Sequence, residues 1–225
     1  MRAAARTKIL ACEVMKKELE KIAREKNLNA DISFIELGLH LVPKKLHNKL
    51  QEALDTCSGY DRVILAFGLC GGSASGIRNG CASLIIPKFH DCVPILLGSL
   101  VQFERYQKEE PGTYYLCRGW VEGGQGILHE YEAWRDKYGE EKAKKLQKIM
   151  YANYRRLIYI HSPVACGTDL RSHAGESARM LNLEYGETVG DLGIMEKILA
   201  GPWDDPDLFV NISPHGVVTE EHFGI

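Results

Sequence analysis

The sequence lacks the features that identify several large classes of protein. Its 225 residues include 28 basic and 30 acidic side chains, so it has no positive excess of the kind that nucleic-acid binding requires. The longest apolar run, residues 93–101, is interrupted by Gly98 and Ser99 and is far shorter than the ~20 residues of a membrane-spanning helix. No signal-like apolar stretch follows the basic N-terminus. We therefore expect a soluble, cytoplasmic protein that binds neither nucleic acid nor membranes.

Cysteine is the residue type that points to chemistry. The chain has seven cysteines but no Cys-x-x-Cys, which excludes zinc-ribbon and thioredoxin-type motifs. An odd number of cysteines in a chain large enough to bury a full core argues against a disulfide framework in a reducing compartment. Core packing, thiol catalysis and metal ligation remain as roles for these side chains.

Apolar periodicity predicts an α/β fold with a mostly parallel sheet. Short buried strands alternate with amphipathic helices through the first third of the chain, which favours parallel strands with right-handed crossovers. After a charged helical stretch at 127–154 the alternation resumes. We predict a single compact unit over residues 1–225, built from two Rossmann-like halves, 1–125 and 126–225, packed around a cleft. Strands are expected at residues 7–12, 32–37, 62–67, 83–86, 113–116, 157–160 and 208–212 and near 183.

Three cysteines fall at or just beyond the carboxyl ends of predicted strands. Cys12 closes the first strand, Cys70 follows the third, and Cys92 follows the fourth. Ligands of parallel α/β sheets bind at this edge, so we expect the three thiols to converge there. Convergent thiolates repel one another and need a cation, and soft sulfur ligands favour an iron–sulfur cluster, our first choice, or zinc. Three protein ligands would leave one coordination position open for a small molecule.

Two polar residues beside Cys92 are candidates for proton transfer. His90 and Asp91 directly precede this cysteine, so either side chain would lie near a ligand bound by the metal. Three other residues are candidates for a fourth ligand to the metal. They are His40, Cys117 and Cys166.

The loop at 68–76 is rich in glycine and follows a predicted strand. Its spacing matches neither of the common nucleotide phosphate motifs. Gly68, Gly71 and Gly72 are predicted to let backbone amides approach the sulfurs of a cluster or an anionic ligand. The alternative is that these glycines serve only the geometry of the turn.

Two other functions stay open beside the metal hypothesis. Cysteine is among the most buried residue types, and Cys70 on a tight glycine turn also suits a metal-free enzyme in which it is the nucleophile and His90 its base. The other possibility is a non-catalytic accessory module. The sequence does not decide between enzyme and binding protein.

A set of short motifs, taken together, resembles the prokaryotic family catalogued as domain of unknown function 1638. The resemblance is clearest over residues 8–120, and it carries Cys12, Cys70, His90, Asp91 and Cys92 as the pattern of the family. It implies a cytoplasmic protein of anaerobes, often encoded near corrinoid-dependent methyltransferases, so a corrinoid protein or methyltransferase is the expected partner. Residues 72–76 and Cys117 depart from the family pattern. The motifs are Ala11-Cys12-Glu13, Gly68-Leu69-Cys70-Gly71, Pro87-Lys88-Phe89-His90-Asp91-Cys92, Leu97-Gly98-Ser99 and Pro111-Gly112-Thr113-Tyr114-Tyr115-Leu116 with Gly119-Trp120.

Overall fold

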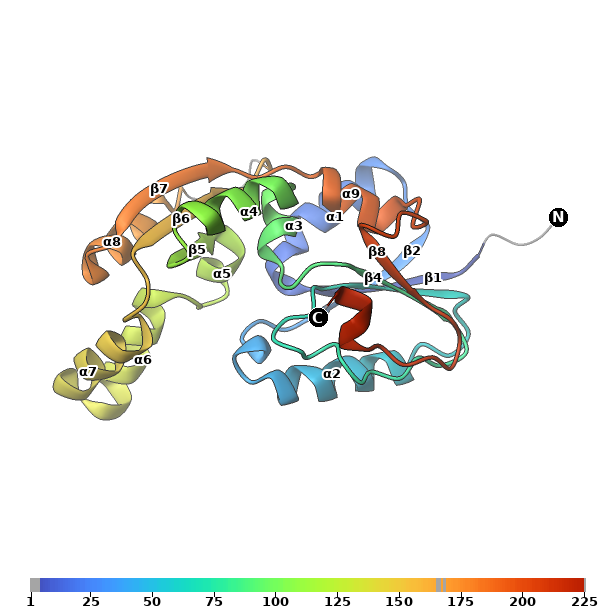
Figure 1. Ribbon diagram of the computed structural model, residues 1–225, viewed down its shortest axis with the longest axis horizontal. Coiled ribbons are helices and arrows are strands. Elements are labelled where there is room, and N and C mark those ends of the chain that lie inside the picture. Colours follow the sequence, from blue (N-terminus) through green and yellow to red (C-terminus); the bar gives the residue numbers. More distant parts are fainter. Residues whose placement is uncertain (1–4, 165–166, 168, 225) are drawn as a thin grey trace. The chain divides into compact units, whose positions relative to one another are not determined.

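A computed structural model describes residues 5–164, 167 and 169–224 of the chain (Figure 1). It contains a mostly parallel five-stranded sheet and a parallel three-stranded sheet with helices between the strands, which confirms the predicted α/β class. Across these described residues, no helix is both long enough and apolar enough to span a bilayer. Residues up to Gly98, together with those from Leu192 onward, form a first unit, and Ser99–Asp191 form a second.

The first unit is built on the five-stranded sheet, in the order β2-β1-β3-β4-β8. Its central strands are short apolar runs buried on both faces, as expected of parallel strands covered by helices. Neighbouring strands among β1 to β4 pair in parallel, and β8 runs antiparallel to β4 at the edge. The strands are β1 (Thr7–Cys12), β2 (Ala30–Ile35), β3 (Arg62–Ala66), β4 (Ser83–Pro87) and β8 (Phe209–Ile212).

Helices cover both faces of this sheet, with α2 on one side and α1 and α9 on the other (Figure 1). Pro43 opens α2 at a position where its missing N–H is tolerated. Leu46, Leu50 and Leu54 lie on one stripe of α2 and pack into the core formed with the strands. The helical segments are η1 (Glu13–Met15), α1 (Lys16–Glu25), η2 (Leu39–Leu41), α2 (Pro43–Asp55), α3 (Val93–Leu97), α9 (Gly193–Ala200) and η3 (Glu220–Phe223).

The second unit contains the three-stranded parallel sheet, in the order β5-β6-β7. Its core joins apolar residues of β5 and β6 to helices α5, α6 and α8. Gly139, with a φ of 82°, separates α6 from α7 within the helical stretch predicted at 127–154. The elements are α4 (Leu100–Glu109), β5 (Thr113–Cys117), α5 (Arg118–Glu122), α6 (Ile127–Tyr138), α7 (Glu140–Met150), β6 (Arg156–His161), α8 (Arg171–Leu181) and β7 (Glu184–Val189).

The division into units differs from the predicted halves 1–125 and 126–225. After β7 the chain returns to the first unit, where α9 packs against α1 and β8 pairs with β4. The apolar run at 208–212 predicts the strand, but its composition carries no information about which sheet it joins. The second unit is therefore an insertion between α3 and α9, not the C-terminal half of the chain.

Truncating a core leucine of α2 tests the packing of the first unit. Leu50 is fully buried, so Leu50→Ala should lower the free energy of unfolding by about 2–5 kcal/mol, through lost burial and the cavity left behind. Denaturant unfolding followed by circular dichroism measures this change. Asn48→Ala, at an exposed position of the same helix, is the control and should change stability by less than about 0.5 kcal/mol. Equal effects of the two substitutions would contradict the assigned helix face.

Candidate thiol site at the carboxyl edge of the first sheet

Three segments that carry predicted site residues meet at one edge of the first sheet. Strands β1, β3 and β4 are parallel neighbours, so their carboxyl ends lie together. Cys12 ends β1, the glycine loop follows β3, and residues 88–92 follow β4. The edge predicted from strand ends is therefore present.

The glycine loop lies directly against the segment that follows β4. The Leu69 N–H donates to the carbonyl of Phe89 at 2.8 Å, and the Cys70 N–H donates to the carbonyl of His90 at 2.9 Å. A Cβ added to Gly68 would lie 2.8 Å from the Asp91 backbone, closer than real Cβ atoms approach. Gly68 is thus required by close backbone packing.

Gly71 and Gly72 have positive φ values of 67° and 83°, a conformation that favours glycine in turns. The geometry of the loop therefore accounts for all three glycines without a ligand. Their predicted contacts with a cofactor stay a prediction.

Cys70 adopts a backbone conformation that is uncommon for a residue with a side chain. Its φ is +48°, in the left-handed region. Its N–H is held by His90, and its carbonyl accepts a hydrogen bond of 2.6 Å from the Ser73 hydroxyl. Residues kept in this region by their surroundings cluster at functional sites, so this conformation marks Cys70 as a functional candidate.

The thiols of Cys12 and Cys70 are partly buried against the core on the α2 side of the sheet. Burial is the main cause that raises the pKa of Cys12, to about 11. Burial, followed by the nearby Cys12 and Asp91 side chains, raises the pKa of Cys70 to about 12. The Cys12 thiol therefore lies close enough to Cys70 to affect its ionisation, and both thiols are protonated at neutral pH.

Asp91 brings a carboxyl group to the same place. Burial raises its pKa, while a hydrogen bond of 2.7 Å from the Val93 N–H to Asp91 Oδ1 opposes this shift. The charge of Asp91 acts on Cys70, so the carboxyl and the thiol are neighbours. The imidazole of His90 is exposed, although its backbone carbonyl holds the glycine loop.

The structure thus brings together Cys12, Cys70 and Asp91 from the predicted site. Cys92 follows Asp91 in the sequence and is the residue that precedes α3. Within the described ranges, no three histidine, cysteine, aspartate or glutamate side chains form a group that could hold a metal ion. The three-cysteine centre stays a prediction.

The candidates for a fourth ligand are dispersed along the chain. His40 is exposed in η2, and Cys117 is buried at the end of β5 in the second unit. Cys166 lies outside the described residues.

Contacts that hold the glycine loop come partly from residues that the sequence did not single out. His47 Nδ1 lies 3.0 Å from the carbonyl of Ser73, on the face of α2 that turns toward the loop. The C-terminal segment adds a hydrogen bond of 2.8 Å from the Gly76 N–H to the carbonyl of Val218. Neither contact can be predicted from a local sequence motif, because both join segments that are distant in the sequence.

Comparison with known proteins gives a family. The family described as "Protein of unknown function (DUF1638)" matches residues 34–199, more than half of the chain. The chain belongs to this family. No curated protein and no solved structure matches the chain.

The DUF1638 match covers Cys70, Asp91 and Cys92 but begins after β1, so Cys12 lies outside it. It also covers the whole of the second unit, beyond the residues on which the resemblance is clearest. Membership therefore bears on the glycine loop and the segment after β4, and leaves Cys12 to the geometry alone.

Replacing Gly68 tests the close approach of the two loops. Gly68→Ala places a methyl group against the Asp91 backbone and should lower the free energy of unfolding by about 1–3 kcal/mol. Gly80→Ala is a matched control, because a Cβ there would meet nothing within 4 Å. Denaturant unfolding of the two variants gives the comparison. A Gly68→Ala variant as stable as Gly80→Ala would contradict the packing.

The raised pKa values predict a pattern of thiol reactivity. Alkylation requires the thiolate, so Cys12 and Cys70 should react with iodoacetamide at pH 7.5 at least about a hundredfold more slowly than the exposed Cys81. Their rates should rise about tenfold per pH unit up to about pH 11, as the thiolate fraction grows. Mass spectrometry of digested protein gives the rate at each site. Rapid labelling of Cys70 at neutral pH would contradict its raised pKa.

Proposed function

We propose that this edge of the first sheet is a metal site, in which Cys12, Cys70 and Cys92 hold an iron–sulfur cluster or, as second choice, zinc. The observation that carries the proposal is the meeting of two partly buried thiols that are distant in sequence, with a carboxyl group beside one of them. Two thiolates at one place repel each other, and a bound cation relieves that repulsion.

The donor chemistry of the two thiols fits a soft metal ion. Thiolate ligands favour zinc and iron–sulfur clusters over magnesium or calcium. Burial keeps the protons on Cys12 and Cys70, and a coordinated metal replaces such protons. These two residues form the anchor of the proposed site. Cys92 is the third ligand in the proposal, and a direct test of its role is needed because the described side chains form no group of three ligands.

The residues around the anchor have roles in this proposal. When bound, the metal would supply an open position for a small one-carbon or sulfur-containing ligand. Asp91, whose pKa is raised by burial, would accept or release a proton beside Cys70. The exposed His90 would exchange that proton with solvent. Backbone amides of the loop at Gly71 and Gly72 would face the ligand.

The biological setting is also part of the proposal. The link to corrinoid-dependent methyl transfer, with a corrinoid protein or methyltransferase as partner, rests on the family resemblance. The cytoplasmic location rests on composition and on the same resemblance. In the alternative of an accessory module, the protein would bind the same partner without catalysing a reaction.

One observation favours a metal-free nucleophile as a second candidate, namely the left-handed backbone of Cys70. Its ionisation argues against that role. A thiol with a pKa of about 12 is thiolate in only about one molecule in 10⁵ at neutral pH. The exposed imidazole of His90 has no hydrogen bond to this thiol among the described contacts. The metal site therefore remains the better-supported function.

Metal content of protein isolated without oxygen is the decisive measurement. We expect stoichiometric iron with acid-labile sulfide and a visible absorption band, or stoichiometric zinc in a colourless protein. Adding zinc to metal-free protein at pH 7 should release about two protons, or three if Cys92 joins Cys12 and Cys70. Cys12→Ser and Cys70→Ser should each abolish stoichiometric binding.

Cys81→Ser is the matched control and should retain full metal content, because that thiol is exposed. Cys92→Ser separates a two-thiol anchor from a three-thiol site by the number of protons released. Protein that contains no metal and takes up none would overturn the proposal. In that case, selective labelling of Cys70 would favour the nucleophile, and unaltered partner capture by Cys70→Ser would favour the accessory module.

A further inference from the structure

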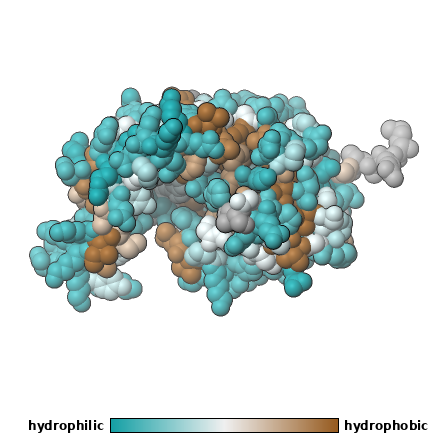
Figure 2. Space-filling model, viewed as in Figure 1, coloured by the Kyte–Doolittle hydropathy of each residue, from teal (hydrophilic) through white to brown (hydrophobic). Residues whose placement is uncertain are grey.

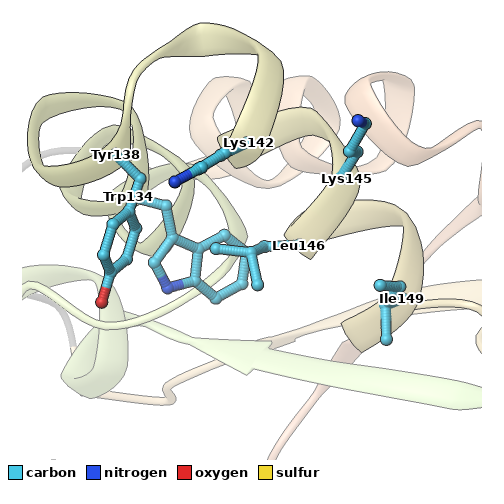
Figure 3. Close-up of a pocket in the computed structure, with 6 residues that line it drawn as sticks. All are labelled: Trp134, Tyr138, Lys142, Lys145, Leu146 and Ile149. Atoms are coloured by element: carbon cyan, nitrogen blue, oxygen red, sulfur yellow. The ribbon is translucent and has the colours of Figure 1, made fainter.

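A groove in the second unit lies away from the thiol residues in sequence and has a different chemistry. Helices α6 and α7 form a hairpin around Gly139 and pack against each other. The groove on this hairpin has a volume of about 440 Å³ (Figure 3). It is lined by Trp134 and Tyr138 of α6 and by Lys142, Lys145, Leu146 and Ile149 of α7.

The floor of the groove is apolar and open to solvent. Trp134 and Leu146 lie side by side at its centre, with Tyr138 at one end and Ile149 at the other (Figure 3). Ile149 is 71 % exposed, and Met150 next to it is 59 % exposed. The space-filling view shows hydrophobic residues at the surface of this hairpin, among hydrophilic neighbours (Figure 2). Contiguous exposed apolar side chains with a polar rim are typical of interaction sites.

The charged groups of the groove all have one sign. The charged side chains that line it are those of Lys142 and Lys145, and no carboxylate lines it. Neither lysine has an ion-pair partner in the described part of the chain, whereas the nearby Lys144 pairs with Glu140 at 3.1 Å. The indole N–H of Trp134 likewise has no acceptor among the described residues. The groove therefore offers hydrogen-bond donors and positive charge on a chain whose formal charge is −2.

We propose that this groove docks an acidic amphipathic helix of a partner protein. A groove between two helices accepts a third helix through apolar side chains at i, i+3, i+4 and i+7. Acidic residues flanking that apolar stripe would meet Lys142 and Lys145, whose charges they complement.

Two other occupants fit the groove less well. A twofold dimer through the same face would bring Lys142 and Lys145 of both copies into one interface, where like charges oppose each other. Pockets for small molecules bury most of the ligand surface, and a groove that leaves Ile149 exposed does not provide such an enclosure.

The test uses the full chain and a synthetic helical peptide that carries leucines on one face and glutamates on the flanks. Fluorescence anisotropy of the labelled peptide should show binding that weakens as salt is raised. The double substitution Lys142→Glu with Lys145→Glu should weaken binding by about tenfold or more. Lys148→Glu, on the same helix but outside the groove, is the control and should change the affinity by less than about twofold. Circular dichroism checks that each variant is folded.

Several results would overturn the docking proposal. A matching peptide with lysine flanks should not bind, so equal binding of the two peptides would remove the role of charge. If the Lys142→Glu, Lys145→Glu variant bound the peptide with unchanged affinity, the peptide would bind outside the groove. Self-association that Ile149→Asp abolishes, seen by sedimentation, would assign the face to a second copy. Tight binding of a fatty-acid anion without peptide binding would assign it to a small ligand.

Discussion

The parallel pairing of β1, β3 and β4 is the constraint on which the candidate site depends. It sets the carboxyl ends of three strands side by side, so that segments far apart in the chain emerge at one edge. Two backbone hydrogen bonds, from the Leu69 and Cys70 N–H groups to the carbonyls of Phe89 and His90, then hold the loop after β3 against the segment after β4. The side chains at this edge are therefore positioned largely by backbone contacts, which require a glycine at position 68.

Local elements follow closely from sequence because they depend on local causes. The strand at 7–12 has the expected bounds, since a short apolar run acts within one element. The return of β8 to the first sheet was not predicted. An edge strand of four residues carries too little pattern to specify its partner, and the pairing with β4 depends on the whole intervening chain.

The site could be predicted as far as strand ends determine it. Cys12 ends a strand and Cys70 follows a turn constrained by Gly68, and these two thiols come together. The position of Cys92 depends on the turn that leads into α3, where Asp91 accepts a hydrogen bond from the Val93 N–H. Where a side chain points after such a turn is decided by loop geometry, which neither periodicity nor spacing records.

The burial of the two thiols places a demand on whatever the site does. Buried thiols without a positive neighbour hold their protons, so the metal-free protein keeps Cys12 and Cys70 neutral and compatible with the apolar core they touch. Chemistry that uses either sulfur as a thiolate therefore needs a positive charge beside the thiol, or a pH of about 11 or higher. A cation meets that demand at neutral pH, and it would bind to a fold already stable with neutral thiols. The same burial that makes Cys70 a poor nucleophile is compatible with the metal we propose, which would have to displace the protons of both thiols.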